Sequence, residues 1–259
     1  MNKGYLNEKE FVESLNEKYI KDLSKNMQDF IYDIFENVNA YDKVVCWKNS
    51  ANQKADFFIK IGNFVKGVSL KLGHDNSIHG ESIQNFKMFL ADLDIPYKVI
   101  EYYKKYHYGL KINDKKIVGK YTAEEYKKEH LEDLMILNKY LNRTRTIISC
   151  VDKFLVRGTN SKYDIAALIS GTPEKFVWIN KYDLYDLVLS HKNDYTTSPH
   201  IGNLIIQPKI RNISGTSKNP GEIHIVQLKW YWIFEDIESF KKQKSLQNMN
   251  NLEKKSNKE

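Results

Sequence analysis

The sequence predicts an α/β fold: a central mixed β-sheet flanked by helices, with added strands toward the C-terminus. Two β-prone segments at residues 55–61 and 65–72 are separated only by a Gly-Asn pair, which is typical of a β-hairpin. Segments with apolar residues at three- and four-residue spacing lie before and after this hairpin and indicate helices. A second pair of β-prone segments, 201–210 and 222–234, predicts another hairpin near the C-terminus.

The length of 259 residues allows one large domain or two small ones. A hydrophobic content of 41% with 28% charged residues is typical of a globular protein that folds in water. The formal net charge of +7 suits a polyanionic partner, because Lys and Arg release counterions when they neutralise phosphates. Charge alone is weak evidence, since many Lys-rich proteins do not bind nucleic acid.

The chain carries only two cysteines, Cys46 and Cys150, too few for a disulfide framework or for a zinc site with Cys-x-x-Cys spacing. Its first residues lack the apolar segment of a signal peptide, and no run approaches 18 apolar residues. We therefore expect a cytoplasmic protein with no membrane association.

The elements around the first hairpin follow from the same patterns. Residues 7–37 have a helical apolar pattern with a break near 24–26, and residues 43–47 form a short strand that completes a three-stranded antiparallel meander. After the hairpin, a helix from Glu81 to Asp94 ends before Pro96, because the residue before a proline disfavours the helical conformation. The segment 146–156 fits either a helix or a strand. The remaining predictions are helices at 97–107, 124–142 (capped by Thr122) and 183–190, and strands at 163–169 and 176–179.

Charged residues interrupt both strands of the first hairpin. Asp56 lies near the start of the first strand and Lys71 near the end of the second, so antiparallel pairing makes them neighbours. A carboxylate and an ammonium at one sheet end can hold a divalent metal and stabilise a negatively charged transition state. Glu81, expected in the first turn of the following helix, offers a second carboxylate. The alternative is an ordinary edge ion pair worth about 0–1 kcal/mol.

At these residues the sequence resembles the PD-(D/E)xK nuclease superfamily, and within it the type II restriction endonucleases. The resemblance covers about residues 30–95 and includes the run SLKLGHDNSIHGE. Asp56 and Lys71 match the family pattern, whereas Ser69 stands where the second acid is usual and Ala55 where the Pro is usual. In a subset of the family, a Glu on the following helix replaces the missing acid, and Glu81 matches it in kind.

The resemblance implies a restriction-endonuclease-like core and a magnesium site. Asp56, Glu81 and the Leu70 carbonyl would bind Mg²⁺, and Lys71 would orient or deprotonate the attacking water. Ser69 would hold a water or Glu81. Family members often add an acid from the N-terminal helix, which makes Glu36 or Asp33 a candidate, although a solvated helix face is the simpler interpretation.

Contacts with DNA are assigned to two polar groups. The first group follows the first hairpin: Asn76, Ser77 and His79. The second group lies on the C-terminal hairpin, which as a two-stranded ribbon fits the major groove: Lys209, Arg211 and Lys229. The same hairpin also contains two Gln-x-Lys sequences that resemble half of the nuclease motif, but no partner strand carries an Asp at the matching end.

The resulting hypothesis is a magnesium-dependent type II restriction endonuclease that hydrolyses double-stranded DNA, acting as a homodimer if it cuts a palindrome. The alternatives are a repair or junction nuclease of the same fold and a DNA-binding protein without catalysis. We expect one nuclease-like domain at 1–240, with the catalytic core at about 25–145 and target recognition at about 146–240. Residues 241–259 lack an apolar pattern and are expected to be a disordered basic tail.

Overall fold

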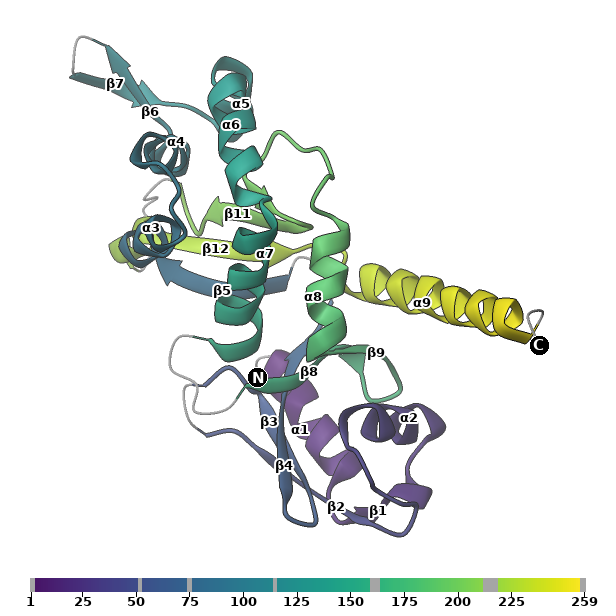
Figure 1. Cartoon of the computed structure of the whole chain (residues 1–259). Helices are drawn as coiled ribbons and strands as arrows, with labels where there is room; N and C mark the ends of the chain where they lie inside the picture. Colours follow the sequence, from purple (N-terminus) through teal and green to yellow (C-terminus); the bar gives the residue numbers. More distant parts are fainter. Residues whose placement is uncertain are drawn as a thin grey trace. The chain divides into compact units, whose positions relative to one another are not determined.

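The chain forms two compact units, each built from segments that are distant in the sequence (Figure 1). The computed structural model describes residues 3–50, 53–73, 76–113, 116–158, 164–211 and 219–256. The first unit comprises Met1–Asn76, Val156–Leu187 and Trp232–Glu259, and the second comprises Ser77–Leu155 and Val188–Tyr231. These units do not follow the expected ranges 25–145 and 146–240, so the assignment of catalysis and recognition to those ranges stays a prediction.

The first unit contains a six-stranded sheet with the order β1-β2-β3-β4-β8-β9. Strands β4 and β8 pair in parallel, and the other neighbours pair antiparallel, so the expected mixed sheet is confirmed. The predicted meander corresponds to β2, β3 and β4. The strands are β1 (Lys18–Tyr19), β2 (Lys43–Lys48), β3 (Phe57–Ile61), β4 (Phe64–Lys71), β8 (Ile165–Thr172) and β9 (Lys175–Asn180).

The turn between β3 and β4 has the predicted two residues. Ile61 pairs with Phe64 across it, and Gly62 takes a φ of +56°, a left-handed conformation that glycine adopts without a steric cost. The hairpin therefore forms where the Gly-Asn pair predicts it.

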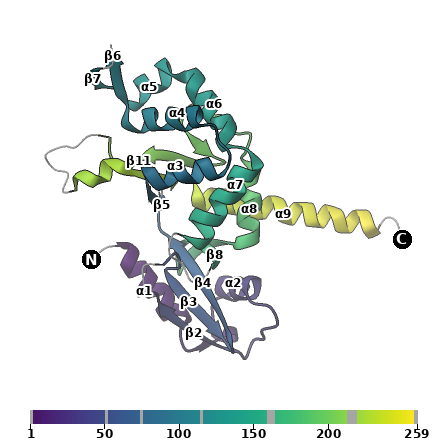
Figure 2. The ribbon, with the colours of Figure 1, turned by 60° about the vertical axis from the view of Figure 1, so that its left-hand side comes forward.

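Two helices pack on this sheet. Helix α1 (Lys3–Leu15) lies along β2 (Figure 2), and α2 (Lys25–Ile34) contacts β9. The helical pattern over 7–37 is interrupted by β1 and a short 3₁₀ turn (Ile20–Asp22), which separate the two helices. The expected break is real: Ser24 caps α2 by accepting a hydrogen bond from the Met27 amide.

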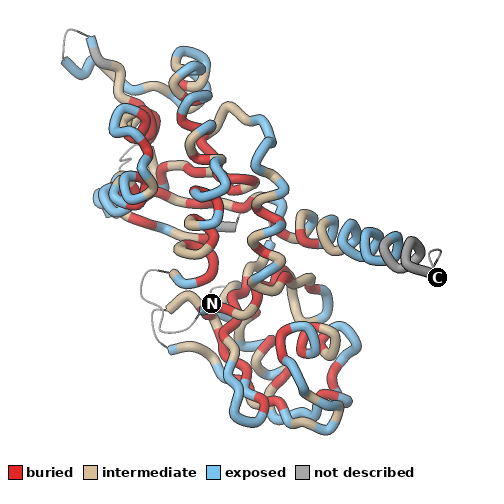
Figure 3. Tube along the Cα trace, viewed as in Figure 1, coloured by how far each residue is buried: buried red, intermediate tan, exposed pale blue. Residues whose placement is uncertain are grey.

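The C-terminal segment is a helix, α9 (Ile233–Ser256), so the expectation of a disordered tail is wrong for residues 241–256. Ile233 and Ile237 are buried, and exposure rises along the helix (Figure 3). Four residues after Ile237, the Lys241 ammonium lies 3.1 Å from the Trp178 ring centroid. These contacts join residues that are distant in the sequence. The absence of an apolar pattern in residues 241–259 therefore did not exclude a helix there.

The second unit contains a four-stranded sheet with the order β10-β11-β12-β5 and a separate hairpin, β6–β7. The antiparallel pairing of β11 with β12 confirms the C-terminal hairpin, although both strands are shorter than expected. Residues 212–218 of its loop, including Lys218, lie outside the described residues. The strands are β5 (Asn76–Ser82), β6 (Leu110–Asn113), β7 (Lys116–Lys120), β10 (His200–Ile201), β11 (Leu204–Pro208) and β12 (Ile225–Trp230).

The helices of this part of the chain agree with the predictions in most places. The helix expected over 124–142 is divided at His130, which leaves the helical conformation. The undecided segment 146–156 is helical and continues from α7 into a π-helix at Val151–Arg157. No helix in the described part of the chain is long and apolar enough to cross a membrane. The helices of this unit are α3 (Ile83–Asp92), α4 (Tyr97–Tyr108), α5 (Ala123–Glu129), α6 (Leu131–Leu141) and α7 (Thr144–Cys150), whereas α8 (Lys181–Ser190) lies mainly in the first unit, which includes its residues up to Leu187.

Candidate active site

Asp56 lies immediately before β3, and its carboxylate is fixed against β4. The Asp56 amide donates to the Val68 carbonyl at 2.8 Å, which extends the hairpin by one backbone bond. Its Oδ2 atom accepts hydrogen bonds from the Ser69 hydroxyl at 3.0 Å and from the Leu70 amide. Both bonds are made to Oδ2, so Oδ1 takes part in neither. The carboxylate is therefore oriented by two donors from a buried strand.

Ser69 has a role that the sequence interpretation did not assign. Its side chain is fully buried, and its hydroxyl donates to Asp56 rather than holding Glu81. A carboxylate at this position would place two negative charges side by side, whereas a hydroxyl supplies a donor. Ser69 thus orients the acid that the neighbouring strand presents.

The segment that carries Asp56 is held from both sides. The Asn49 amide donates to the Asp56 carbonyl at 3.0 Å, and the Asn49 side chain donates to the Ala55 carbonyl at 2.7 Å. A Cβ added to Gly67 would lie 3.0 Å from the Ala55 Cβ, which is tighter than normal packing. Close approach of the two strands at this point therefore requires glycine at 67 and a small residue at 55.

Two lysines lie near the Asp56 carboxylate. Lys71 ends β4 and is partly exposed, and its register partner is Ser170 of the parallel strand β8. The pKa of Lys54 is lowered to about 7, mainly by desolvation and also by the Lys71 charge, while the Asp56 charge opposes the shift. The expected proximity of Asp56 and Lys71 thus extends to a third charged group, Lys54.

Sequence reasoning missed Lys54. It lies outside the strand periodicity, in the segment before β3, so no alternation pattern singles it out. The available signal was its position two residues before the candidate acid. Its unusual pKa depends on burial, which only the folded chain reveals.

Glu81 belongs to β5 in the second unit, so its expected position in the first turn of a helix is wrong. The helix begins at Ile83 because Ser82 is its cap and accepts a hydrogen bond from the Asn85 amide at 3.1 Å. The Glu81 side chain is buried, and its Oε1 accepts from the Ser82 amide and the Asn85 side chain, both at 2.9 Å. Its convergence with Asp56 on one metal stays a prediction.

The other candidate acids lie apart from the β4 end or are already engaged. Glu36 is exposed and follows the end of α2. Asp33 accepts hydrogen bonds from Trp178 at 2.6 Å and from Asn180 at 3.2 Å. Among the described residues, no group of three His, Cys, Asp or Glu side chains could hold a metal ion. Asp56 still fits magnesium, which binds proteins through one or two carboxylates and takes its other ligands from water and phosphate.

The residues expected to touch DNA after the first hairpin belong to β5. The Ser77 hydroxyl is exposed and accepts a hydrogen bond from Gln227 at 2.9 Å. His79 packs against Phe154 at a centroid distance of 4.8 Å, and its Nε2 lies 3.7 Å from a Glu81 oxygen. The side chain of Asn76 lies outside the described residues.

The basic residues of the C-terminal hairpin differ in exposure. Lys209 is exposed and forms an ion pair with Glu222 at 2.7 Å. Lys229 is partly buried. Arg211 donates to the Tyr106 carbonyl at 3.1 Å and lies over the Tyr106 ring, so it contributes to the packing of the second unit. Lys209 is therefore the best placed of the three for a phosphate contact.

The mixed sheet with its flanking helices defines a restriction-endonuclease-like fold. A solved structure described as the restriction endonuclease MspI in complex with its cognate DNA is similar, with a TM-score of 0.57 over 87% of this chain and 88% of that chain. The two sequences are 15% identical, so the likeness concerns the fold. No family model and no curated protein matches the sequence.

Proposed function

We propose that this protein is a magnesium-dependent endonuclease that hydrolyses phosphodiester bonds of duplex DNA, as a type II restriction endonuclease does. The observation that carries the proposal is the Asp56 carboxylate, oriented by Ser69 and Leu70 beside two lysines. This arrangement lies at the end of a strand pair within a restriction-endonuclease-like fold. Fold alone does not define an activity, so the argument rests on the site.

The metal ligands in this proposal are Asp56, the Leu70 carbonyl and Glu81. A magnesium ion there would act as a Lewis acid on the scissile phosphate and lower the pKa of a bound water. Asp56 supplies a fixed carboxylate in the first unit. Glu81 is the weaker assignment, because its Oε1 atom already accepts two hydrogen bonds at the start of α3.

Lys71 would orient or deprotonate the attacking water and offset the charge on the phosphate. Lys54 supports this role by its position: its charge and that of Lys71 disfavour each other. A phosphate bound nearby would relieve that repulsion, since it is an anion between two cations. The pair would thus favour a bound phosphate over the empty site.

DNA binding is supported by the net charge of +7 and by the exposed Lys209. The MspI structure contains that enzyme's cognate DNA. By analogy, we propose duplex DNA as the substrate here. If the target is palindromic, two copies related by a two-fold axis would cut the two strands.

The test is incubation of the purified full chain with phage DNA and MgCl₂, with EDTA as the control. Discrete fragments with reproducible ends support a restriction endonuclease. Cleavage confined to branched substrates would favour a repair or junction nuclease instead. Retardation of duplex DNA on a gel without cleavage at any Mg²⁺ concentration would leave a binding protein and refute the catalytic proposal.

A further inference from the structure

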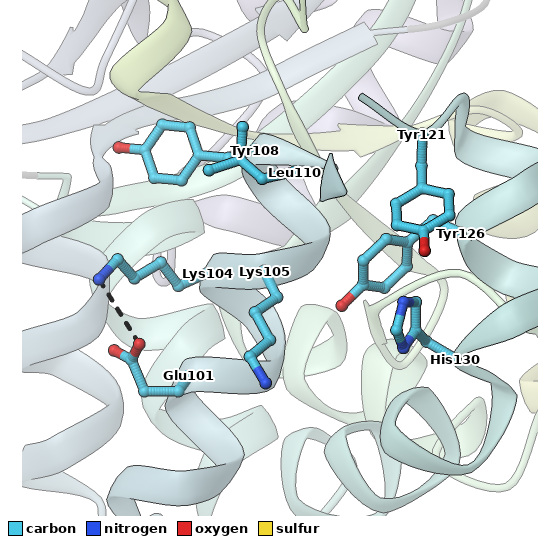
Figure 4. Close-up of a pocket in the computed structure, with 8 residues that line it drawn as sticks. All are labelled: Glu101, Lys104, Lys105, Tyr108, Leu110, Tyr121, Tyr126 and His130. Carbon is cyan, nitrogen blue, oxygen red and sulfur yellow. Dashed lines mark hydrogen bonds and ion pairs between the residues drawn. The ribbon is translucent and has the colours of Figure 1, made fainter. Parts of the chain in front are cut away.

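A cavity of about 370 Å³ lies within the second unit, between α4 and the segment from the end of β7 through α5 (Figure 4). This volume falls within the range of about 300–1,000 Å³ typical of small-ligand sites. The two walls differ in chemistry. Helix α4 contributes mainly polar and charged side chains: Glu101, Lys104, Lys105 and Tyr108. The opposite wall is aromatic: Tyr121, Tyr126 and His130.

The aromatic wall is a compact cluster. The Tyr126 and His130 rings have centroids 4.3 Å apart and are tilted by 32°, and Tyr121 meets Tyr126 edge-on at 5.6 Å. A planar heteroaromatic ligand gains most from such a surface, because aromatic rings and nucleobases stack on one another regardless of base identity.

The Tyr126 hydroxyl is a buried polar group without a partner. Tyr126 is 1% exposed, and its hydroxyl makes no hydrogen bond to any residue that the structure describes. In Figure 4 it points from the aromatic wall toward the lysines of α4. The capping box of Thr122 and Glu125 fixes the first turn of α5 and hence the position of this ring. An unsatisfied buried hydroxyl destabilises the empty cavity, and a ligand with a polar edge would satisfy it.

The α4 wall has an excess of positive charge. The Glu101 carboxylate forms ion pairs with two ammonium groups, that of Lys87 at 2.9 Å and that of Lys104 at 3.5 Å. One negative charge therefore faces two positive charges. Lys105 is exposed and forms no ion pair with the described residues. An anionic group on the ligand would therefore find the Lys105 ammonium at this wall, with the Lys104 ammonium, which also contacts Glu101, on the same helix.

We propose that the cavity binds a nucleotide. Its base would lie against Tyr121 and His130, the two partly exposed rings of the aromatic wall, with a hydrogen bond to the Tyr126 hydroxyl. Its phosphate would lie at Lys104 and Lys105. The site is additional to the proposed nuclease chemistry, because that proposal assigns no role in cleavage to any of its residues. A free mononucleotide and an unpaired nucleotide of a DNA strand share this chemistry, and the experiment separates them.

The experiment uses the full chain in EDTA, which removes cleavage from the measurement. Calorimetric titration with each of the four deoxynucleoside monophosphates is one arm, with inorganic phosphate as the comparison. The other arm is quenching of 2-aminopurine fluorescence in a single-stranded oligonucleotide. Saturable binding in the first arm identifies a free nucleotide, and quenching in the second arm without the first identifies a nucleotide within a strand. Both results support the proposal.

Three variants connect binding to the cavity. Tyr126→Phe removes only the hydroxyl and should weaken binding about fivefold, the scale of one hydrogen bond. Its melting temperature without ligand should be unchanged or higher, because an unsatisfied polar atom is lost; a purely structural tyrosine would lower it. Lys105→Gln should also weaken binding about fivefold and reduce its salt dependence. Lys98→Gln, an exposed change on the same helix outside the cavity, should have no effect.

Three results would overturn the proposal. The first is inorganic phosphate binding as tightly as the mononucleotides, because the aromatic wall would then contribute nothing. The second is the absence of saturable binding in both arms. The third is binding that Tyr126→Phe and Lys105→Gln leave unchanged, which would place the ligand elsewhere. A failure of Mg²⁺-dependent cleavage affects none of these outcomes.

Discussion

Two antiparallel hairpins, β3–β4 and β11–β12, share a sequence pattern and differ in chemistry. Strand β4 ends on Ser69-Leu70-Lys71, β12 carries Gln227-Leu228-Lys229, and Gln207-Pro208-Lys209 runs from β11 into the residue after it. In the first hairpin, the carboxylate of Asp56, which lies just before β3, accepts hydrogen bonds from the Ser69 hydroxyl and the Leu70 amide of β4. In the second, Gln207 and Gln227 are register partners, and the sequences of β11 and β12 contain no Asp or Glu.

The polar residues of the second hairpin are those of an ordinary half-exposed sheet. Buried and partly exposed positions alternate along β12, with Gln227 and Lys229 on the partly exposed face. Gln227 binds Ser77, and Gln207 accepts from Tyr231 at 3.3 Å. A lysine two residues after a polar residue is thus uninformative by itself. It indicates a site when a carboxylate is fixed against the same strand.

The largest expected effect is on catalysis at the first hairpin. Asp56→Asn should lower the cleavage rate by about 10³-fold, the scale of losing one essential electrostatic group. Asparagine keeps an oxygen for Ser69 and Leu70, so the fold should survive. Asp22→Asn, an exposed change in the same unit, is the matched control. Equal rates for both variants in a Mg²⁺-dependent cleavage assay would remove Asp56 from the site.

The comparison also predicts opposite outcomes for the two lysines. Lys71→Ala should lose cleavage on the same scale of about 10²–10³-fold. Lys229→Ala should keep the turnover rate at saturating DNA, because its hairpin lacks the carboxylate. If Lys229→Ala lost turnover and Lys71→Ala kept it, the catalytic assignment would move to the second hairpin.

The assignment of Glu81 can be tested by loss and rescue. Glu81→Ala should lower Mg²⁺-dependent cleavage by about 10²-fold or more, with DNA binding retained. Adding Ser69→Glu should restore partial cleavage, since catalytic groups must lie within about 0.5 Å of their productive positions. Because Ser69 is buried beside Asp56, the new carboxylate should lower the melting temperature in EDTA, and Mg²⁺ should raise it again. Full activity of Glu81→Ala would be decisive against Glu81 as a ligand.

A pH effect is expected where the second hairpin is anchored. His107 on α4 donates from Nε2 to the Ile223 carbonyl at 2.8 Å, just before β12, and burial lowers the pKa of His107 to about 4. Between pH 6.5 and 4, His107 is protonated in the unfolded chain and neutral in the folded chain. The free energy of unfolding therefore falls as the pH drops, by at most about 1.4 kcal/mol per pH unit. In urea titrations, His107→Gln should flatten this dependence. The same dependence of unfolding free energy on pH in the variant and in the unchanged protein would contradict the prediction.

The smallest expected effect concerns DNA affinity. Lys209→Ala should weaken binding several-fold and reduce the slope of log K against log salt by about one unit, the value for one phosphate contact. Arg211→Ala should instead lower thermal stability, because Arg211 packs on Tyr106. If the salt slope of Lys209→Ala is unchanged, Lys209 does not contact a phosphate, and the β11–β12 hairpin has a structural role only.

The sequence by itself determined the local elements. The Gly-Asn turn, the helix break near 24–26, the Thr122 cap and the end of a helix before Pro96 each depend on neighbouring residues, and each appears close to where the pattern predicts it. The sequence also singled out Asp56 and Lys71, because antiparallel pairing across a two-residue turn predicts which residues share a sheet end; their joint role in a site stays a prediction.

The tertiary structure decided what local patterns do not contain. Helix α9 begins at Ile233 with buried residues, and its later part at 241–256 continues from them. Lys241 contacts Trp178, a residue more than 60 positions away in the sequence. The Ser69 bond to Asp56, the lowered pKa of Lys54 and the unpaired Tyr126 hydroxyl all arise from burial by distant segments. Desolvation and long-range packing depend on the whole fold, so a periodicity of two or 3.6 residues does not encode them.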